Sequence, residues 1–291
     1  MVETVACNLC SSSEARARPE KTRFLNIEPP FGIAECLSCG FLFQSPRPTL
    51  VELKKMYATH PYYSEKNASR GERRTGFYEA RMRRLESFKP KRGDVLSIGC
   101  LEGGYFLKVA RSFGWQVEGV EFSEILREHA RSALDIDVKL AEGWDLASFA
   151  GNLYDVIYSH SLEHVLDARR TLQQCRGLLK QDGLLVLEVP NQFYSLKDKL
   201  KAGFLALTGH RTSGLFYQET KAEFHTYFFN PRTLRRILTS EGFELLSFRT
   251  YMPSHPVYTS NPTGRWLQEA IYAVGGIFER GPSMEAIARV T

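Results

Sequence analysis

From residue 93 onward the chain alternates between two patterns of apolar and polar positions. Short apolar runs, typical of buried strands, stand at 94–100, 116–123, 138–143, 154–161 and 183–191. Stretches with helical spacing of apolar residues lie among them, at 103–114, 124–134 and 166–180. Alternating strands and helices predict a parallel sheet covered by helices on both faces, which is an α/β fold.

The first ninety-two residues follow a different pattern. A short strand is predicted at 41–44, and the prolines of "SPRP" separate it from a helix that starts near Thr49. A basic helix is predicted over about 70–88. We therefore expect a small module at 1–48, a helical linker at 49–92 and a main domain at 93–291.

Composition places the chain among globular proteins. It has 291 residues, of which 43% are hydrophobic and 24% charged, enough for one large domain and a small module. The formal net charge of +5 is compatible with nucleic acid or an anionic substrate and requires neither. The N-terminus lacks the apolar core of a signal peptide, and no apolar run reaches the length of about 18 residues that spans a bilayer. We expect a cytoplasmic protein with no membrane span.

Four of the six cysteines form two C-x-x-C pairs separated by 25 residues. Two such turns can supply four thiolates to one tetrahedral ion, so the pattern predicts a structural zinc ribbon. A redox dithiol beside an accidental pair is the alternative. Because thiolates fill all four positions, no open site for water remains, and a catalytic metal is not expected. The predicted ligands are Cys7, Cys10, Cys36 and Cys39.

Two features stand at the ends of the first two predicted strands of the main domain. The turn "SIGCLEGGYF", residues 97–106, is small and glycine-rich, so the backbone can approach a cofactor closely there. Glu121 ends the next strand, 22 residues after Gly99. A carboxylate at this spacing can accept both ribose hydroxyls of a nucleoside, although it could also serve as a charge at a helix N-terminus. Together the two features predict a nucleoside cofactor.

The stretch "HSLEH", residues 160–164, matches the H-x-x-E-H signature of some zinc peptidases. That signature needs both histidines on one helix face, four residues apart. Here the predicted strand runs directly into His160, and a helix can begin only later. We therefore reject a zinc hydrolase and expect His160 to lie where this strand meets the cofactor.

The order of these motifs resembles that of class I S-adenosylmethionine-dependent methyltransferases. "VLSIGCLEGGYFL", "VEGVEFS", "YDVIYSHSLEHVLD" and "LLKQDGLLVLEVPN" resemble the family's successive strand motifs, and "MEAIARV" its last strand. The resemblance implies a Rossmann-like methyltransferase fold with a mostly parallel seven-stranded sheet whose last strand is antiparallel. A preceding zinc ribbon is similar to that of a subgroup that includes sugar C-methyltransferases.

The same resemblance implies S-adenosylmethionine as cofactor and a set of residues around it. The family usually has an acid where this chain has Ser97 and a glycine where it has Leu101. These two departures leave open the alternative that the protein is a catalytically inactive relative of the family. Tyr105 and Trp144 could line the cofactor pocket or belong to the core. The implied cofactor-binding residues are Ser97, Gly99, Cys100, Leu101, Glu102, Gly103, Tyr105, Phe106, Glu121, Phe122, Gly143, Trp144, Ser159 and His160.

The resemblance also implies where the acceptor binds. An insertion at about 191–224 follows the fifth strand of the main domain, and His225 comes directly after it. His225 is predicted to act at the acceptor, with Tyr227 or Glu223 as helper, and His160 to flank the reacting end of the cofactor. Holding the loop in place is the alternative role for His225.

Three functions follow from these features. The favoured one is methylation of a small molecule, such as a sugar or a natural-product or polysaccharide intermediate. The second is methylation of RNA or protein, with the basic helix around Arg81, Arg83 and Arg84 in contact with the macromolecule. The third is a non-catalytic binding module.

Overall fold

The structure is a computed structural model of the chain, and it divides into two compact units. It describes residues 1–25, 27–59, 72, 74–99, 104–141, 144–149, 153–208, 225–252 and 262–291. The sheet unit consists of Leu50–Leu187, Leu238–Leu246 and Ile287–Thr291, and the ribbon unit consists of Met1–Thr49, Glu188–Ile237 and Ser247–Ala286.

The larger sheet has seven strands in the order β12-β13-β10-β9-β6-β7-β8. It is mostly parallel, with its antiparallel part at the last strands of the chain, and it confirms the predicted fold class. The final strand is inserted between β10 and β12. The strands are β6 Asp94–Ile98, β7 Gln116–Glu121, β8 Val138–Leu140, β9 Tyr154–Ser159, β10 Leu179–Pro190, β12 Phe243–Tyr251 and β13 Ser283–Val290.

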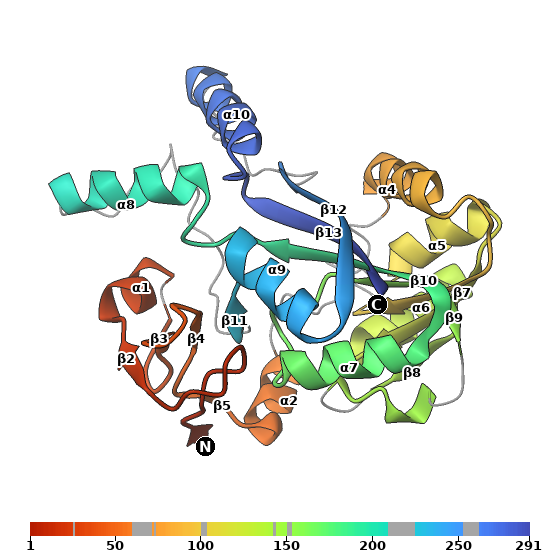
Figure 1. The fold of residues 1–291 in the computed structure, drawn as a ribbon, viewed down its shortest axis with the longest axis horizontal. Coiled ribbons are helices and arrows are strands. Elements are labelled where there is room, and N and C mark those ends of the chain that lie inside the picture. The colour runs from red at the N-terminus through yellow and green to blue at the C-terminus, as the bar shows by residue number, and fades with distance from the viewer. Residues whose placement is uncertain are drawn as a thin grey trace. The chain divides into compact units, whose positions relative to one another are not determined.

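Helices of the sheet unit connect and cover these strands (Figure 1). From β6 the chain steps to β7 and β8 in one direction and to β9 and β10 in the other. Because such crossovers are right-handed, α5 and α6 cover one face of the sheet and α7 covers the opposite face. The helices are α2 Leu50–Thr59, α4 Thr75–Phe88, α5 Tyr105–Ser112, α6 Glu124–Leu134 and α7 Ala168–Leu178, with a short 3₁₀ turn at Ala147–Phe149.

Local sequence explains where α6 and α7 begin. Ser123 caps α6 by accepting the Leu126 N–H, and Asp167 caps α7 by accepting the Arg170 N–H at 3.0 Å. Between β9 and α7 the chain forms a turn, in which the His164 N–H donates to the Ser161 carbonyl. His160 and His164 therefore do not share a helix, which agrees with the rejection of a zinc-peptidase site.

The ribbon unit contains a four-stranded antiparallel sheet in the order β11-β4-β3-β2. Strand β11 comes from far along the chain, so residues 1–48 do not make this sheet alone. The strands are β1 Val2–Glu3, β2 Ala15–Ala17, β3 Ile33–Cys36, β4 Leu42–Gln44, β5 Arg47–Pro48 and β11 Tyr227–Phe228. The helices are α1 Pro19–Phe24, α8 Leu196–Thr208, α9 Pro231–Ser240, which runs on into the sheet unit, and α10 Pro262–Ile277.

In the part of the chain that the structure describes, none of the helices combines the length and the apolar character that crossing a membrane requires.

Candidate functional site

The carboxyl ends of three parallel strands meet at one edge of the sheet. Ile98, the last residue of β6, is in register with Val120 of β7 and with Ser159 of β9. The residues that follow, Gly99, Glu121 and His160, therefore share this edge. In open α/β sheets ligands bind at such an edge where the strand order reverses, which here is between β6 and β9.

Gly99 has a backbone geometry that only glycine adopts without strain. Its φ is +75°, and a Cβ built there would lie 2.7 Å from the Cβ of Ser161. The Ser161 hydroxyl in turn donates to the Ile98 carbonyl at 3.0 Å and bonds to the Ser159 hydroxyl. The turn after β6 is thus packed tightly against the turn after β9. Ser97 lies buried in β6, whereas Cys100, Leu101, Glu102 and Gly103 lie outside the described residues.

Glu121 is buried, with 2% of its surface exposed. Its Oε1 accepts the backbone N–H groups of Phe122 at 2.7 Å and Ser123 at 3.1 Å. This is the helix N-terminal role that the sequence left as an alternative, and it fixes the orientation of the carboxylate. A carboxylate can accept about four hydrogen bonds, so capping does not exclude a ligand role.

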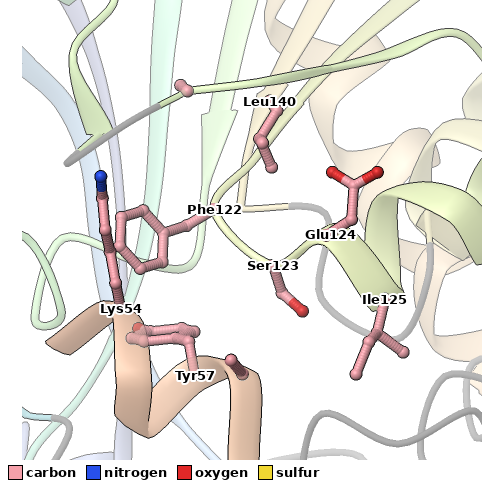
Figure 2. Close-up of a pocket in the computed structure, with 9 residues that line it drawn as sticks. Lys54, Tyr57, Phe122, Ser123, Glu124, Ile125 and Leu140 are labelled. Atoms are coloured by element: carbon pink, nitrogen blue, oxygen red, sulfur yellow. The ribbon is translucent and has the colours of Figure 1, made fainter.

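A pocket of about 350 Å³ opens at the ends of β7 and β8, and its lining begins at Phe122, the residue after Glu121 (Figure 2). Phe122 and Leu140 come from these strand ends, while Lys54 and Tyr57 come from α2. The Tyr57 and Phe122 rings pack edge to face, with centroids 4.7 Å apart. From the sequence, α2 was predicted to be part of a linker. Its contribution to the pocket could not be predicted, because no local sequence pattern indicates a contact between residues 57 and 122.

Trp144 lies between this pocket and the Gly99 turn. Its indole stacks on Phe122, with centroids 5.7 Å apart, and its Cη2 lies 3.4 Å from a Cβ built on Gly99. The side chain is 3% exposed, its backbone has φ +62°, and its buried Nε1 has no hydrogen-bond partner among the described residues. A bulky residue with positive φ is strained, and a buried N–H without a partner is costly. Gly143 lies outside the described residues.

Two of the implied cofactor residues at the start of α5 belong to the core. Phe106 stacks on Tyr158 of β9, with centroids 3.9 Å apart, and packs edge to face against Tyr78 of α4. Tyr105 is 7% exposed, and burial raises its pKa. Tyr105 belongs to the same buried hydrophobic cluster as Phe106, the core position that was the alternative for it.

His160 follows β9 directly and stays neutral at pH 7. Burial, followed by the positive charges of Arg74, His164 and Arg81, lowers its pKa to about 3. Nearby in sequence, Glu163 is 3% exposed, and burial raises its pKa to about 8. The His164 Nε2 lies 3.7 Å from the Glu163 carboxylate.

Residues 70–247, more than half of the chain, match the family model described as a methyltransferase domain. The chain belongs to this family.

Two curated relatives are similar to part of this chain. The ubiquinone biosynthesis O-methyltransferase of Cereibacter sphaeroides is 36% identical over 104 residues, covering 34% of this chain and 41% of that protein. A probable S-adenosylmethionine-dependent methyltransferase of Mycobacterium tuberculosis is 30% identical over 100 residues, covering 34% of this chain and 36% of the relative. The chain thus spans less than half of the length of these relatives.

Solved structures extend the likeness over most of the chain. A methyltransferase from Archaeoglobus fulgidus has a TM-score of 0.50 at 20% identity, covering 74% of this chain and 94% of its own. A protein from Pyrococcus horikoshii has a TM-score of 0.52 at 16% identity, and the match covers 81% of this chain and 99% of that protein. At these identities the likeness shows the fold, which is that of class I methyltransferases.

The two remaining predicted catalytic residues of this methyltransferase lie in the ribbon unit. The His225 Nδ1 lies 2.8 Å from the Gln192 Oε1, and because a carboxamide oxygen can only accept, the ring donates from Nδ1. Tyr227 is 1% exposed and stacks on Phe41, with centroids 5.8 Å apart. Its ring is part of the aromatic core around β4, and this position gives no support to a helper role. Glu223 lies outside the described residues.

The four cysteines of the two C-x-x-C pairs form one cluster. Their Sγ atoms all lie within 4.8 Å of one another, with Cys7–Cys39 at 3.6 Å and Cys10–Cys36 at 3.5 Å. A tetrahedral zinc ion with Zn–S bonds of about 2.3 Å separates its sulfurs by about 3.8 Å, whereas a disulfide needs about 2.05 Å. The cluster therefore fits a metal ion and not a pair of disulfides.

The two knuckles of the cluster have the same backbone turn. The Ser11 N–H donates to the Cys7 carbonyl, and the Gly40 N–H donates to the Cys36 carbonyl, at 2.8 and 2.9 Å. Both Ser11 and Gly40 have positive φ. Burial raises the pKa of Cys7, and that of Cys39 to about 11, so ionising all four thiols without a cation would be costly.

The basic helix α4 does not present its arginines as one surface. Arg83 is exposed and pairs with Glu79 at 2.8 Å, Arg84 lies over the Phe88 ring, and Arg81 lies over the Phe77 ring. Three side chains with different environments do not form a continuous phosphate-binding face.

Proposed function

We propose that this protein transfers a methyl group from S-adenosylmethionine to a small-molecule acceptor. The observation that carries the proposal is the convergence of Gly99, Glu121 and His160 at the carboxyl ends of three adjacent parallel strands, beside a largely apolar pocket. The relatives named as O-methyltransferases in ubiquinone biosynthesis support a small acceptor. Calorimetric titration with S-adenosylmethionine and S-adenosylhomocysteine tests the proposal, and the absence of binding by both would overturn it.

Within this site each residue would hold a different part of the cofactor. The backbone at Gly99 would pass close to it, Glu121 would accept the ribose hydroxyls, and Phe122 with Tyr57 would hold the adenine ring in the apolar pocket. When bound, S-adenosylmethionine supplies an electrophilic methyl group on a sulfonium. The protein then mainly positions the acceptor in line with that group.

Two histidines would act on the acceptor side. His160 is neutral at pH 7, so it would flank the reacting end without adding a positive charge. His225 would take the proton from the acceptor atom that forms the new bond, and it would use Nε2 in the neutral tautomer that donates from Nδ1 to Gln192. Gln192 would position this base by fixing its tautomer.

We also propose that the cysteine cluster binds one structural zinc ion. The sulfur spacing supports this assignment, as does the shared turn of the two knuckles. Four thiolates leave no coordination position for a reactant, so the ion would stabilise the ribbon and take no part in the reaction.

Glu121→Gln is expected to weaken binding of S-adenosylhomocysteine by about 10- to 100-fold, the equivalent of about 1.5–3 kcal/mol for hydrogen bonds to a charged group. The glutamine oxygen can still accept the two backbone N–H groups, so the cap of α6 is retained. Calorimetry gives the dissociation constants, and thermal melting checks the fold. Glu128→Gln, on the exposed face of the same helix, should leave affinity unchanged, and equal affinities for all three proteins would refute the role of Glu121.

Trp144 is expected to change its environment when the cofactor binds, because its indole lies against the glycine turn that the cofactor would approach. Titration with S-adenosylhomocysteine should therefore alter tryptophan fluorescence. The change should vanish in Trp144→Phe and persist in Trp266→Phe, whose tryptophan is 70% exposed. An undiminished signal in Trp144→Phe would contradict the assignment.

A further inference from the structure

Helix α8 of the ribbon unit has an apolar side that is exposed. Leu200, Phe204 and Leu207 follow one face of the helix at the spacing i, i+4, i+7, and all three are exposed. Asp198 and Lys201 on the same helix are buried instead. A surface helix normally buries its apolar stripe and exposes its charged residues, so α8 shows the reverse arrangement.

Helix α10 of the same unit has a similar arrangement. Trp266, Val274 and Ile277 follow one face at the spacing i, i+8, i+11, and all three are exposed. Gln268 and Tyr272 lie on the opposite face, where both are buried and the amide Nε2 donates to the hydroxyl at 2.9 Å. From residue 270 to residue 278 the chain has no charged side chain.

The start of α8 packs on the end of α10 (Figure 1). The Leu196 N–H donates to the Arg280 carbonyl at 2.8 Å, and a Cβ built on Gly275 would lie 3.4 Å from the Leu196 Cβ. Leu200 lies one turn after Leu196, and Ile277 lies between Gly275 and Arg280, so both apolar stripes reach this junction. We call these exposed residues the α8–α10 face: Leu200, Phe204, Leu207, Trp266, Val274 and Ile277.

The charges without a carboxylate partner at this junction are positive. Lys199 is exposed in the first turn of α8, and its Nζ lies 5.5 Å from the Tyr194 ring centroid. Arg280 is exposed just after α10, and among the described residues neither it nor Lys199 forms an ion pair. The acids here are not free, because Glu279 pairs with Arg235 at 2.9 Å and Glu269 is also engaged.

These charges favour a negatively charged partner over a second copy of the chain. In a two-fold dimer the same surface faces itself, so Lys199 and Arg280 would add uncompensated positive charge to both sides of the interface. An anionic surface would instead be complementary to both cations.

The shape of the α8–α10 face also favours lipid. Leu207, Ile277 and Trp266 are 88%, 77% and 70% exposed, so they project from the protein and do not form a flat patch. A protein partner would need pockets complementary to these side chains, whereas lipid chains adapt to any shape. Exposed Trp, Phe and Leu beside basic residues are typical of helices that lie in the interface of a membrane.

We propose that the α8–α10 face binds the surface of an anionic lipid bilayer. Leu207, Ile277 and Trp266 would enter the boundary between head groups and acyl chains, and Lys199 and Arg280 would contact the head-group phosphates. The two helices would lie on the bilayer and not cross it. This inference goes beyond the proposed methyl transfer and does not depend on it.

The test is sedimentation of the full-length protein with vesicles of phosphatidylcholine, either pure or mixed with phosphatidylglycerol. We expect binding to the mixed vesicles and much weaker binding to the neutral ones. In Leu207→Asn/Ile277→Asn the affinity should fall by about tenfold or more, because two apolar side chains no longer enter the lipid. Leu153→Asn changes an exposed apolar residue of the sheet unit and should bind as the unmodified protein does. An equal loss in Leu153→Asn, or no binding of the unmodified protein to either vesicle, would overturn the proposal.

The double variant Lys199→Gln/Arg280→Gln tests the electrostatic contribution. Its affinity for the mixed vesicles should fall by about fivefold for each charge removed, and added salt should weaken binding of the unmodified protein. Thermal melting should be unchanged in both double variants, because the four substituted side chains are exposed. Equal binding of the unmodified protein to neutral and anionic vesicles would contradict the role of the two cations.

Two further measurements separate lipid from a second copy. Emission of the exposed Trp266 should move to shorter wavelength when mixed vesicles are added, and this shift should vanish in Trp266→Phe, since Trp115 and Trp144 are buried. An unchanged emission on binding would contradict insertion of this residue. Light scattering gives the mass in the absence of vesicles, and a dimer that dissociates in Leu207→Asn/Ile277→Asn would assign the face to a second copy and overturn the proposal.

Discussion

Cys36→Ser is expected to abolish metal binding and to unfold the N-terminal part of the ribbon unit. Structural zinc in small modules contributes an apparent binding free energy of about 10–16 kcal/mol, and this energy is coupled to folding. Strands β2, β3 and β4 are only three or four residues long and cannot supply comparable apolar burial. Elemental analysis should find one zinc ion per unmodified chain and far less in the variant, and limited proteolysis should cut the variant within the first fifty residues.

The control is Ser38→Ala, a change within the same C-x-x-C turn at a residue whose exposed hydroxyl bonds only to Ser12 among the described contacts. It should keep a full complement of zinc. Stoichiometric zinc in Cys36→Ser, or none in the unmodified protein after growth in zinc-supplemented medium, would show that the cluster is not a zinc site.

Loss of the ion should also affect the proposed base. Strand β4 follows the second knuckle directly and pairs with β11, which begins two residues after His225. A disordered ribbon would free this strand, so turnover should fall. Binding of S-adenosylhomocysteine should remain, because the proposed cofactor residues lie in the sheet unit.

The fold could be predicted because its signals are local. Each strand of the parallel sheet is a separate apolar run, and three of these runs, at 94–100, 116–123 and 154–161, are followed by a helix with regular apolar spacing. The same logic located Gly99 and Glu121, because adjacent parallel strands place their carboxyl ends at one edge whatever the details of packing. Their positions directly after successive strands were therefore sufficient to predict that Gly99 and Glu121 lie close together.

Contacts between distant segments could not be predicted in this way. Tyr57 contributes to the pocket only because α2 packs near the end of β7, and β11 joins a sheet whose other strands end before residue 45. Tyr227 was assigned to a helper role from its place in a motif, and its buried ring stacks on Phe41, a residue 186 positions earlier in the chain. A pattern of residue types specifies which face of an element is buried and not which partner buries it.

His225→Ala is expected to lower the rate of methyl transfer by about 10²- to 10⁴-fold, the usual contribution of a positioned general base. The affinity for S-adenosylhomocysteine should not change, since the imidazole would act on the acceptor and not on the cofactor. Incubating a metabolite extract with labelled cofactor and following intact mass provides an acceptor for this measurement. Exogenous imidazole should restore part of the rate in His225→Ala, which a merely structural histidine would not allow.

Gln192→Ala separates positioning from catalysis. Without the contact to Nδ1 the ring can adopt either tautomer, so we expect a smaller loss of rate, about tenfold, with His225 still present. Thr208→Ala, at the exposed end of α8 in the same insertion, is the matched control and should retain full activity. Two results would show that His225 is not the base. One is an unchanged rate of methyl transfer in His225→Ala, and the other is a loss of rate together with a loss of cofactor affinity. In either case the histidine holds the loop in place, and the proton is removed by another group or is not removed at all. An acceptor atom that carries no proton needs no base, so retained activity would also point to a nucleophile of that kind.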